Sequence, residues 1–130
     1  MIRFFYSLLV YFLLPFTCFK LIYRGFRQPD YLKYWGERYG FYSASTKKIW
    51  GARKILWIHA VSVGETKAAI PLIKLFLKKY PRHYLLITHG TPTGRATSID
   101  IKDSRISRIY LPFDTPDATK RFLSTFKPEM

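Results

Sequence analysis

The chain has 130 residues and a formal net charge of +14, from 22 lysines and arginines against 8 aspartates and glutamates. Because 48% of its residues are hydrophobic and 18% are aromatic, it is too apolar to be intrinsically disordered, and its length suits about one domain. A disulfide scaffold is excluded, since Cys18 is the only cysteine, and no Cys/His spacing of a zinc site is present. Nearly all of the positive excess lies in the first hundred residues, so this part attracts anionic partners such as membrane lipids, phosphorylated substrates or nucleic acid.

The amino terminus carries an uncharged apolar run from Phe4 to Phe19. With the apolar residues that follow Lys20, the run approaches the ~20 residues that span a bilayer, although Pro15 interrupts it. Basic residues after the run favour a cytoplasmic location for the rest of the chain, since positive flanks stay on that side. We therefore expect residues 1–27 to form a membrane-anchor helix with a basic flank, which either spans the membrane or lies in its surface. A buried helix of a soluble core is the less favoured alternative.

Residues 28–53 form a basic, aromatic connector, in which we expect a short helix from Tyr31 to Arg38. Its aromatic side chains could stack on nucleic-acid bases, yet such residues beside a membrane segment more often lie at the headgroup interface. We therefore favour membrane contact, or packing beneath the next domain, over nucleic-acid binding.

From Lys54 onward, apolar runs of strand length alternate with helical patterns. This alternation predicts an α/β fold with a Rossmann-like parallel sheet. Right-handed crossovers would bring the loops after the first two strands, Ser62–Thr66 and Thr88–Gly94, side by side at the carboxyl edge of the sheet, where such sheets bind ligands. The expected strands are 55–61, 84–88 and 106–113, and the expected helices run from the turn at 62–64 to Pro81, from 95 to about 101 and from 114 to about 126.

The first of these loops contains Glu65, the only acidic residue between residues 51 and 99. A lone carboxylate at the carboxyl end of a strand could remove a proton from a hydroxyl nucleophile. It could instead interact with the helix dipole and stabilise the helix by about 0.3–1 kcal/mol. The residues alone favour neither of these two roles over the other. Beside it, Gly64 permits a tight turn and close approach of a ligand, while Ser62 and the free helix amides can donate to an anion.

The second loop is rich in hydroxyls, backbone amides and glycine, a composition suited to holding a phosphate or a sugar. It lacks the lysine and the spacing of a P-loop. His59 and His89 end adjacent strands and could meet at the site, although structural or polar-contact roles are favoured for both. Neither a metal site nor a nucleophilic triad can be assembled from the sequence.

Several segments are distinctive in combination: KYWGERYGFY, WIHAVSVGETKAAIPLIKLFLKKYP, ITHGTPTG and YLPFDTPDATKRFLSTFKPEM. In this order they closely resemble the amino-terminal part of the Kdo transferases. These bacterial enzymes move 3-deoxy-D-manno-octulosonic acid (Kdo) from CMP-Kdo to a lipid A precursor. The resemblance, with the apolar run before it, covers essentially the whole chain.

The resemblance implies a GT-B glycosyltransferase, in which two Rossmann-like domains face each other across a cleft and the amino-terminal one binds most of the acceptor. It also implies that Glu65 is the catalytic base, which deprotonates the acceptor hydroxyl so that this hydroxyl displaces CMP with inversion. The residues expected to position the acceptor are Ser62, Gly64, Thr91, Thr93 and Gly94.

The resemblance further implies CMP-Kdo as the donor and the phosphorylated glycolipid lipid IVA as the acceptor, with no cofactor, metal ion or nucleic acid. The expected location is the cytoplasmic face of the bacterial inner membrane, where lysines and arginines can meet the phosphates of the acceptor.

The family continues beyond KPEM with a further strand and a carboxyl-terminal domain that holds most of the nucleotide contacts. We therefore expect residues 54–130 to be a partial acceptor-binding domain that is inactive alone, because half of the cleft is absent. The alternatives are a non-catalytic membrane-anchored remnant, or one half of a split enzyme whose carboxyl-terminal half is separately encoded. A basic nucleic-acid-binding protein is least favoured.

Overall fold

The computed structural model describes residues 1–44, 46 and 54–129. Residues 45 and 47–53 of the predicted connector, and residue 130, lie outside the described part of the chain.

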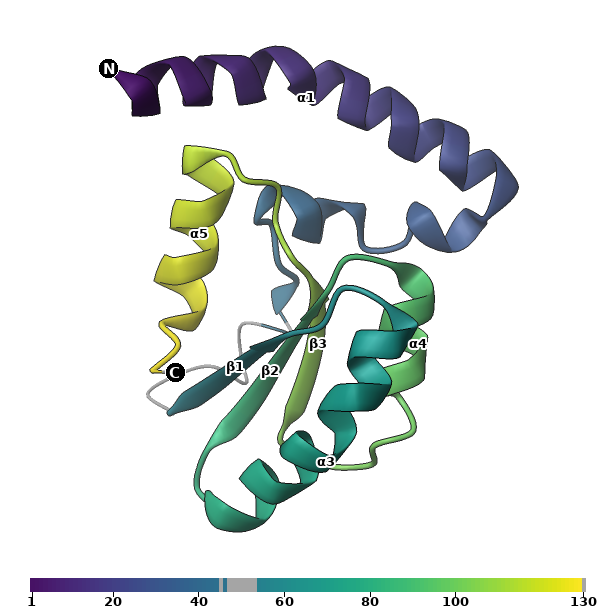
Figure 1. Ribbon diagram of the computed structural model, residues 1–130, viewed down its shortest axis with the longest axis vertical. Coiled ribbons are helices and arrows are strands. Elements are labelled where there is room, and N and C mark those ends of the chain that lie inside the picture. The colour runs from purple at the N-terminus through teal and green to yellow at the C-terminus, as the bar shows by residue number, and fades with distance from the viewer. Residues whose placement is uncertain (45, 47–53, 130) are drawn as a thin grey trace.

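Within the described residues, three strands form a parallel sheet in the order β1-β2-β3 (Figure 1). They are β1 (Ile55–His59), β2 (Tyr84–His89) and β3 (Ile106–Tyr110). The predicted α/β, Rossmann-like fold is therefore confirmed. β1 and β3 end earlier than predicted. After β3, Pro112 has no N–H for the ladder, and the Phe113 N–H donates instead to the Arg38 carbonyl, 2.7 Å away.

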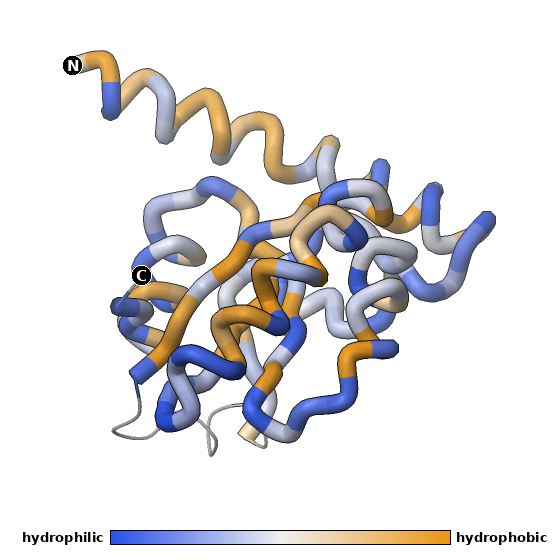
Figure 2. The backbone as a smooth tube through the Cα atoms, turned by 60° about the horizontal axis from the view of Figure 1, so that its bottom comes forward, coloured by the Kyte–Doolittle hydropathy of each residue, from blue (hydrophilic) through white to orange (hydrophobic). Residues whose placement is uncertain are grey.

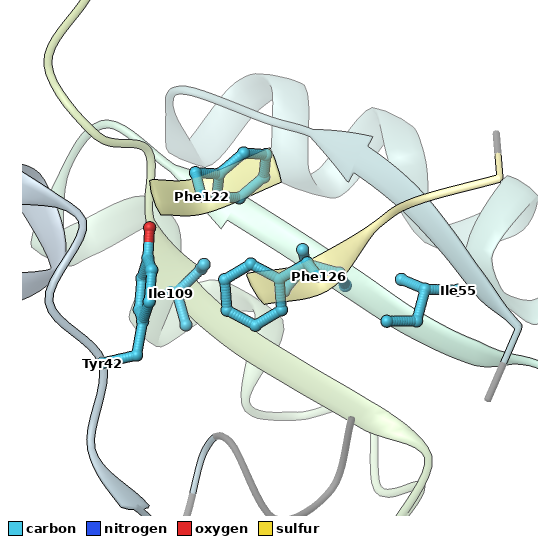
Figure 3. Packing of buried hydrophobic residues seen from close by; sticks show 6 residues of the cluster. Tyr42, Ile55, Ile109, Phe122 and Phe126 are labelled. Atoms are coloured by element: carbon cyan, nitrogen blue, oxygen red, sulfur yellow. The ribbon is translucent and has the colours of Figure 1, made fainter. Parts of the chain in front are cut away.

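Helices cover both faces of the sheet (Figure 1). On one face, Ile73 of α3 (Val63–Lys79) packs against Leu56, Leu85 and Ile87. The short helix α4 (Pro92–Ser98) lies beside α3. On the other face, α5 (Pro116–Phe126) places Phe122 and Phe126 over the sheet (Figure 3). Apolar side chains on both sides of each strand explain the near-continuous hydrophobic runs in the sequence.

The starts of the last two helices compare differently with the prediction. α4 begins at Pro92, three residues before the predicted start at Arg95. α5 begins at Pro116, with Thr115 as its N-cap, and ends at Phe126, so the helix predicted from 114 to about 126 is confirmed. In each case a threonine is the N-cap and a proline follows it in the first turn, a combination that starts a helix without an unused N–H.

Between residues 28 and 40, the connector forms two 3-10 helices, η1 (Pro29–Tyr31) and η2 (Trp35–Tyr39), so the prediction of one short helix from Tyr31 to Arg38 was wrong. The backbone of Tyr34 is left-handed, with φ of 57°, and breaks the helical path between them. After η2, Tyr42 joins Ile109, Phe122 and Phe126 in the core beneath α5 (Figure 3). The described part of the connector therefore packs on the domain, one of the two placements favoured from the sequence.

Helix α1 (Ile2–Arg27) passes over the domain on the side where the strands end (Figure 1). It is long and apolar enough to cross a membrane, and most of its surface is exposed. Figure 2 shows that most of α1 is hydrophobic and that hydrophilic residues gather toward its carboxyl-terminal end. Pro15 lies inside the helix without ending it.

Candidate functional site

The carboxyl edge of the sheet is formed by three loops, each of which starts a helix. Ser62, Thr91 and Thr115 are the N-caps of α3, α4 and α5, and each side chain accepts a hydrogen bond from the amide three residues later. The distances are 3.5 Å to the Glu65 nitrogen, 3.1 Å to the Gly94 nitrogen and 3.3 Å to the Ala118 nitrogen. Serine and threonine at these positions thus fix where each loop ends.

The first two loops lie side by side, as predicted. The Val61 carbonyl accepts hydrogen bonds from the Gly90 N–H at 3.2 Å and from the Thr91 hydroxyl at 3.1 Å. The buried Thr66 hydroxyl contacts the Ser62 carbonyl at 2.8 Å and the Gly94 carbonyl at 3.4 Å. These contacts join the start of α3 to the start of α4.

Glu65 lies in the first turn of α3, and its side chain is exposed. Its Oε2 atom accepts a hydrogen bond from the Val61 N–H at 2.8 Å. Because the carbonyl of the same residue binds Gly90 and Thr91, the carboxylate lies on the same rim as the second loop. The acid therefore orients the loop before α3 and also presents a charged oxygen to solvent at the junction of the two loops.

The two predicted glycines have different surroundings. A Cβ atom at Gly94 would lie 3.0 Å from the Val61 carbonyl oxygen and 3.2 Å from the Ser62 carbonyl carbon, so glycine allows the two loops to approach. A Cβ atom at Gly64 would have nothing within 4 Å. The turn itself therefore does not require glycine at position 64, and the bare backbone there faces open space beside Glu65.

The remaining predicted residues divide in the same way. Thr93 is exposed, and its hydroxyl lies 3.4 Å from the Thr91 hydroxyl. Ser62 and Thr91 are half-buried and already engaged as caps. Three predicted residues, Gly64, Glu65 and Thr93, thus face solvent, while the other three hold the loops together.

The two histidines do not meet. His89 is fully buried on the side of α4, with Nδ1 2.9 Å from the Ala60 carbonyl oxygen and Nε2 3.1 Å from the Ser98 hydroxyl. Burial lowers the pKa of His89 to about 4. His59 lies on the opposite face of the sheet, because its Nδ1 contacts the Thr88 hydroxyl, which the Trp57 indole also reaches. His89 therefore has the structural role favoured from the sequence.

A buried ion pair next to the second loop was missed by the sequence reasoning. Glu37 of η2 binds Arg95 of α4, with Oε2 2.6 Å from Nη1, and accepts the Tyr110 N–H at 2.9 Å. The neighbouring Arg38 donates from Nη2 to the Gly90 carbonyl at 3.1 Å and lies over the Tyr110 ring. Burial lowers the pKa of Arg38. The only sequence feature that could have indicated this ion pair is the adjacent acidic and basic residues, Glu37 and Arg38, within the aromatic connector.

Among the described residues, no group of three or more histidine, cysteine, aspartate or glutamate side chains could hold a metal ion. The groups that the two site loops present are the Glu65 carboxylate, threonine and serine hydroxyls, and backbone amides.

Comparison with known proteins gives the family. Residues 33–130 match the family model described as 3-deoxy-D-manno-octulosonic-acid transferase (kdotransferase). The chain is 34% identical over 129 residues to the 3-deoxy-D-manno-octulosonic acid transferase of Haemophilus influenzae. The matched region covers 98% of this chain and 29% of that protein. It is 43% identical over 79 residues to the transferase of Bordetella pertussis, covering 56% of this chain and 18% of that protein.

A plant protein is also similar: the probable mitochondrial 3-deoxy-D-manno-octulosonic acid transferase of Arabidopsis thaliana is 30% identical over 123 residues, 95% of this chain and 27% of that protein. No solved structure matches the chain. The chain spans less than a third of the length of these relatives. Because the family match extends over most of the connector and the whole parallel sheet, the chain belongs to the 3-deoxy-D-manno-octulosonic-acid transferase family.

Proposed function

We propose that this chain is the acceptor-binding part of an inverting Kdo transferase that moves Kdo from CMP-Kdo to lipid IVA in lipopolysaccharide biosynthesis. The observation that carries the proposal is the exposed carboxylate of Glu65 at the junction of the two site loops. Family membership supports the reaction class, and the position of the carboxylate supports a base on the acceptor side.

The proposed step needs one carboxylate oxygen. With Oε2 oriented by the Val61 N–H, Oε1 of Glu65 takes the proton of the acceptor hydroxyl. As that proton leaves, the hydroxyl oxygen forms a bond to the anomeric carbon of Kdo, and the bond from this carbon to the CMP phosphate oxygen breaks. Attack from the face opposite CMP inverts the configuration.

Two kinds of residues support this step. Gly64 and Thr93 lie exposed near Glu65 and would contact the acceptor sugar directly. Ser62, Thr91 and Gly94 would act by holding the two loops in register, as their hydrogen bonds and close packing indicate. CMP-Kdo would be bound mainly by a second domain, supplied in the same chain or by a separately encoded one.

The proposed location is the cytoplasmic face of the bacterial inner membrane. Helix α1 is long and apolar enough for membrane association, and the net charge of +14 favours the phosphates of anionic lipids and of lipid IVA. We propose no cofactor and no metal ion for the reaction.

The test is a chimera in which residues 1–130 replace the matching segment of the Haemophilus influenzae relative. In detergent, with CMP-Kdo and lipid IVA, we expect Glu65→Gln to lower the transfer rate by about 100- to 10,000-fold, the usual contribution of a general base. The glutamine amide oxygen can still accept from the Val61 N–H, so thermal unfolding should stay unchanged.

Glu65→Ala is the matched control, because it removes both the base and the bond to Val61. We expect the same loss of activity and, in addition, a loss of stability of about 1 kcal/mol from the helix start. An active Glu65→Gln chimera would rule out the base. If the parent chimera is inactive, the same two substitutions are made in the intact relative at the position that aligns with Glu65.

We also expect residues 1–130 by themselves to form no Kdo-modified lipid, because the donor would not be held next to Glu65. Mass spectrometry of lipid IVA after incubation with CMP-Kdo checks this expectation. Product formed by the 130-residue chain alone would show that no second domain is needed.

A further inference from the structure

Helix α1 has two distinct faces. Its buried and half-buried positions recur with helical spacing and face the domain: Ser7, Val10, Leu14, Thr17, Cys18, Leu21 and Gly25. These are small or polar residues more often than not. At Gly25, a Cβ atom would lie 2.5 Å from Leu32, so the helix contacts the connector closely at this end.

The opposite face consists of large exposed apolar side chains: Phe5, Leu8, Leu9, Phe12, Phe16 and Phe19. Phe12 is 69% exposed and Phe19 is 71% exposed. A soluble protein seldom leaves such a continuous apolar strip in water. The segregation of small and large residues indicates that one face belongs to the domain and the other to an apolar phase.

Polar bonds tie α1 to the domain at three places. The Tyr6 hydroxyl donates to Asp114, and the Tyr11 hydroxyl donates to Asp117 at 2.7 Å. The Cys18 thiol lies 2.8 Å from the Tyr39 hydroxyl. From residue 6 to residue 18 these contacts cover ~18 Å of helix, at ~1.5 Å per residue.

This length decides how the helix can meet a bilayer. If α1 crossed the hydrocarbon core, the segment from Tyr6 to Cys18 would lie inside it, and the charged start of α5 could not follow. The bonds to Asp114 and Asp117 can persist only if the helix stays beside the domain.

Cations flank the apolar strip at both ends. Lys20, Arg24 and Arg27 line a hollow at the end of α1, where the two arginines also contact the rings of Tyr31 and Tyr23. At the other end, a groove of about 930 Å³ between α1 and α5 is lined by three cations, Arg3, Lys120 and Lys127, and by one acid, Asp114. A leaflet with anionic headgroups matches this charge at both ends of the helix.

We propose that α1 lies in the surface plane of an anionic phospholipid leaflet, with its phenylalanine- and leucine-rich face inserted and its small-residue face kept on the domain. The inference rests on the membrane association in the proposed function and goes beyond it. Because α1 passes over the side of the domain where the strands end, the carboxyl edge that carries Glu65 would face the membrane (Figure 1). The acceptor could then react without leaving the leaflet.

The test uses single cysteines in a Cys18→Ser background, where serine can still bond to Tyr39. Cysteines at Phe5, Phe12 and Phe16 on the outer face, and at Val10 and Leu14 on the inner face, carry an environment-sensitive fluorophore. The full 130-residue chain is bound to vesicles of phosphatidylcholine and phosphatidylglycerol, and nitroxide lipids report the depth of each label.

We expect the three outer labels to show the same shallow depth, about 5–10 Å below the headgroups, and the inner labels to show little quenching. A depth that changes steadily along the chain, equal on both faces, would mean a spanning helix and overturn the inference. Labels that remain in water at every position would overturn both the inference and the membrane part of the proposed function, while the Glu65→Gln assay in detergent would stand.

A second measurement does not depend on labels. Replacing Phe5, Phe12 and Phe16 together by serine should weaken vesicle binding by roughly tenfold or more, since three large apolar side chains leave the lipid. Replacing Val10 and Leu14 by serine should leave binding within about twofold, since these residues face the domain. Equal losses in the two variants would contradict the proposed orientation.

Discussion

At the scale of single residues, Glu37 has the largest expected effect on stability. Its buried carboxylate pairs with Arg95 and accepts the Tyr110 N–H, so it links the connector to α4 and β3. We expect Glu37→Gln to lower the free energy of unfolding by about 3 kcal/mol, because the charge of Arg95 loses its partner in a largely buried place.

Asp30→Asn is the matched control, since Asp30 pairs with Lys33 on the surface, where the two side chains are 53% and 67% exposed. Its cost should stay below about 1 kcal/mol, as is usual for exposed pairs. Chemical unfolding in detergent measures the free energy of unfolding of the two variants. Equal losses of stability would show that the buried Glu37–Arg95 pair contributes no more than an exposed pair.

His89 predicts a pH dependence of stability. Its pKa is lowered to about 4 by burial, whereas the unfolded chain has the ordinary value of about 6.5. Between these two values the unfolded chain binds a proton that the folded chain does not. Stability should therefore fall as the pH drops through this window, by about 1.4 kcal/mol per pH unit, and this contribution should be flat above pH ~6.5.

The measurement is the free energy of unfolding at several pH values between 7.5 and 4.5, for the parent chain and for His89→Gln. The variant should lack this part of the slope, whatever its absolute stability. Parallel curves would mean that His89 is protonated equally in both states.

At the scale of elements, the starts of α3 and α4 can be separated by two glycine substitutions. Gly94→Ala should destabilise the fold by about 1–2 kcal/mol, because its Cβ would press on the backbone of Val61 and Ser62. Gly64→Ala should raise stability by about 0.5–1 kcal/mol, because its Cβ meets open space and alanine favours a helix.

In the chimera, the same Gly64→Ala change should lower transfer if the acceptor approaches the bare backbone there. Thermal unfolding and the transfer assay together check the pair of glycines. Two stability changes of the same sign would contradict the different surroundings described above.

The order of the strands and helices was predictable because apolar periodicity, proline and glycine mark it locally. The start of α4 was not, because the prediction treated Pro92 as part of a loop when Thr91 and Pro92 together begin a helix. The helix expected from Tyr31 to Arg38 failed for a related reason: propensity did not reveal the left-handed backbone of Tyr34.

At the scale of the whole molecule, contacts between distant segments were the least predictable part. The position of Glu65 between a strand and a helix follows from the local sequence pattern. The structure adds that Val61, which binds the Glu65 carboxylate, also binds Thr91 of the second loop. The pair of Glu37 with Arg95 joins residues 58 apart in the chain, and no local pattern encodes it. No local pattern encodes the partners of Tyr6 and Tyr11 either, because Asp114 and Asp117 lie near the other end of the sequence. These two hydrogen bonds set the orientation of α1 relative to the domain.

The proposed role of Glu65 as the base is tested most directly by a single-turnover experiment. With lipid IVA and CMP-Kdo already bound to the chimera, the rate of the transfer step is measured for the parent and for Glu65→Gln, together with the affinity for lipid IVA. We predict a transfer step slower by about 100-fold or more at unchanged lipid affinity. A transfer step within about threefold of the parent, or a loss explained wholly by weaker lipid binding, would contradict the account.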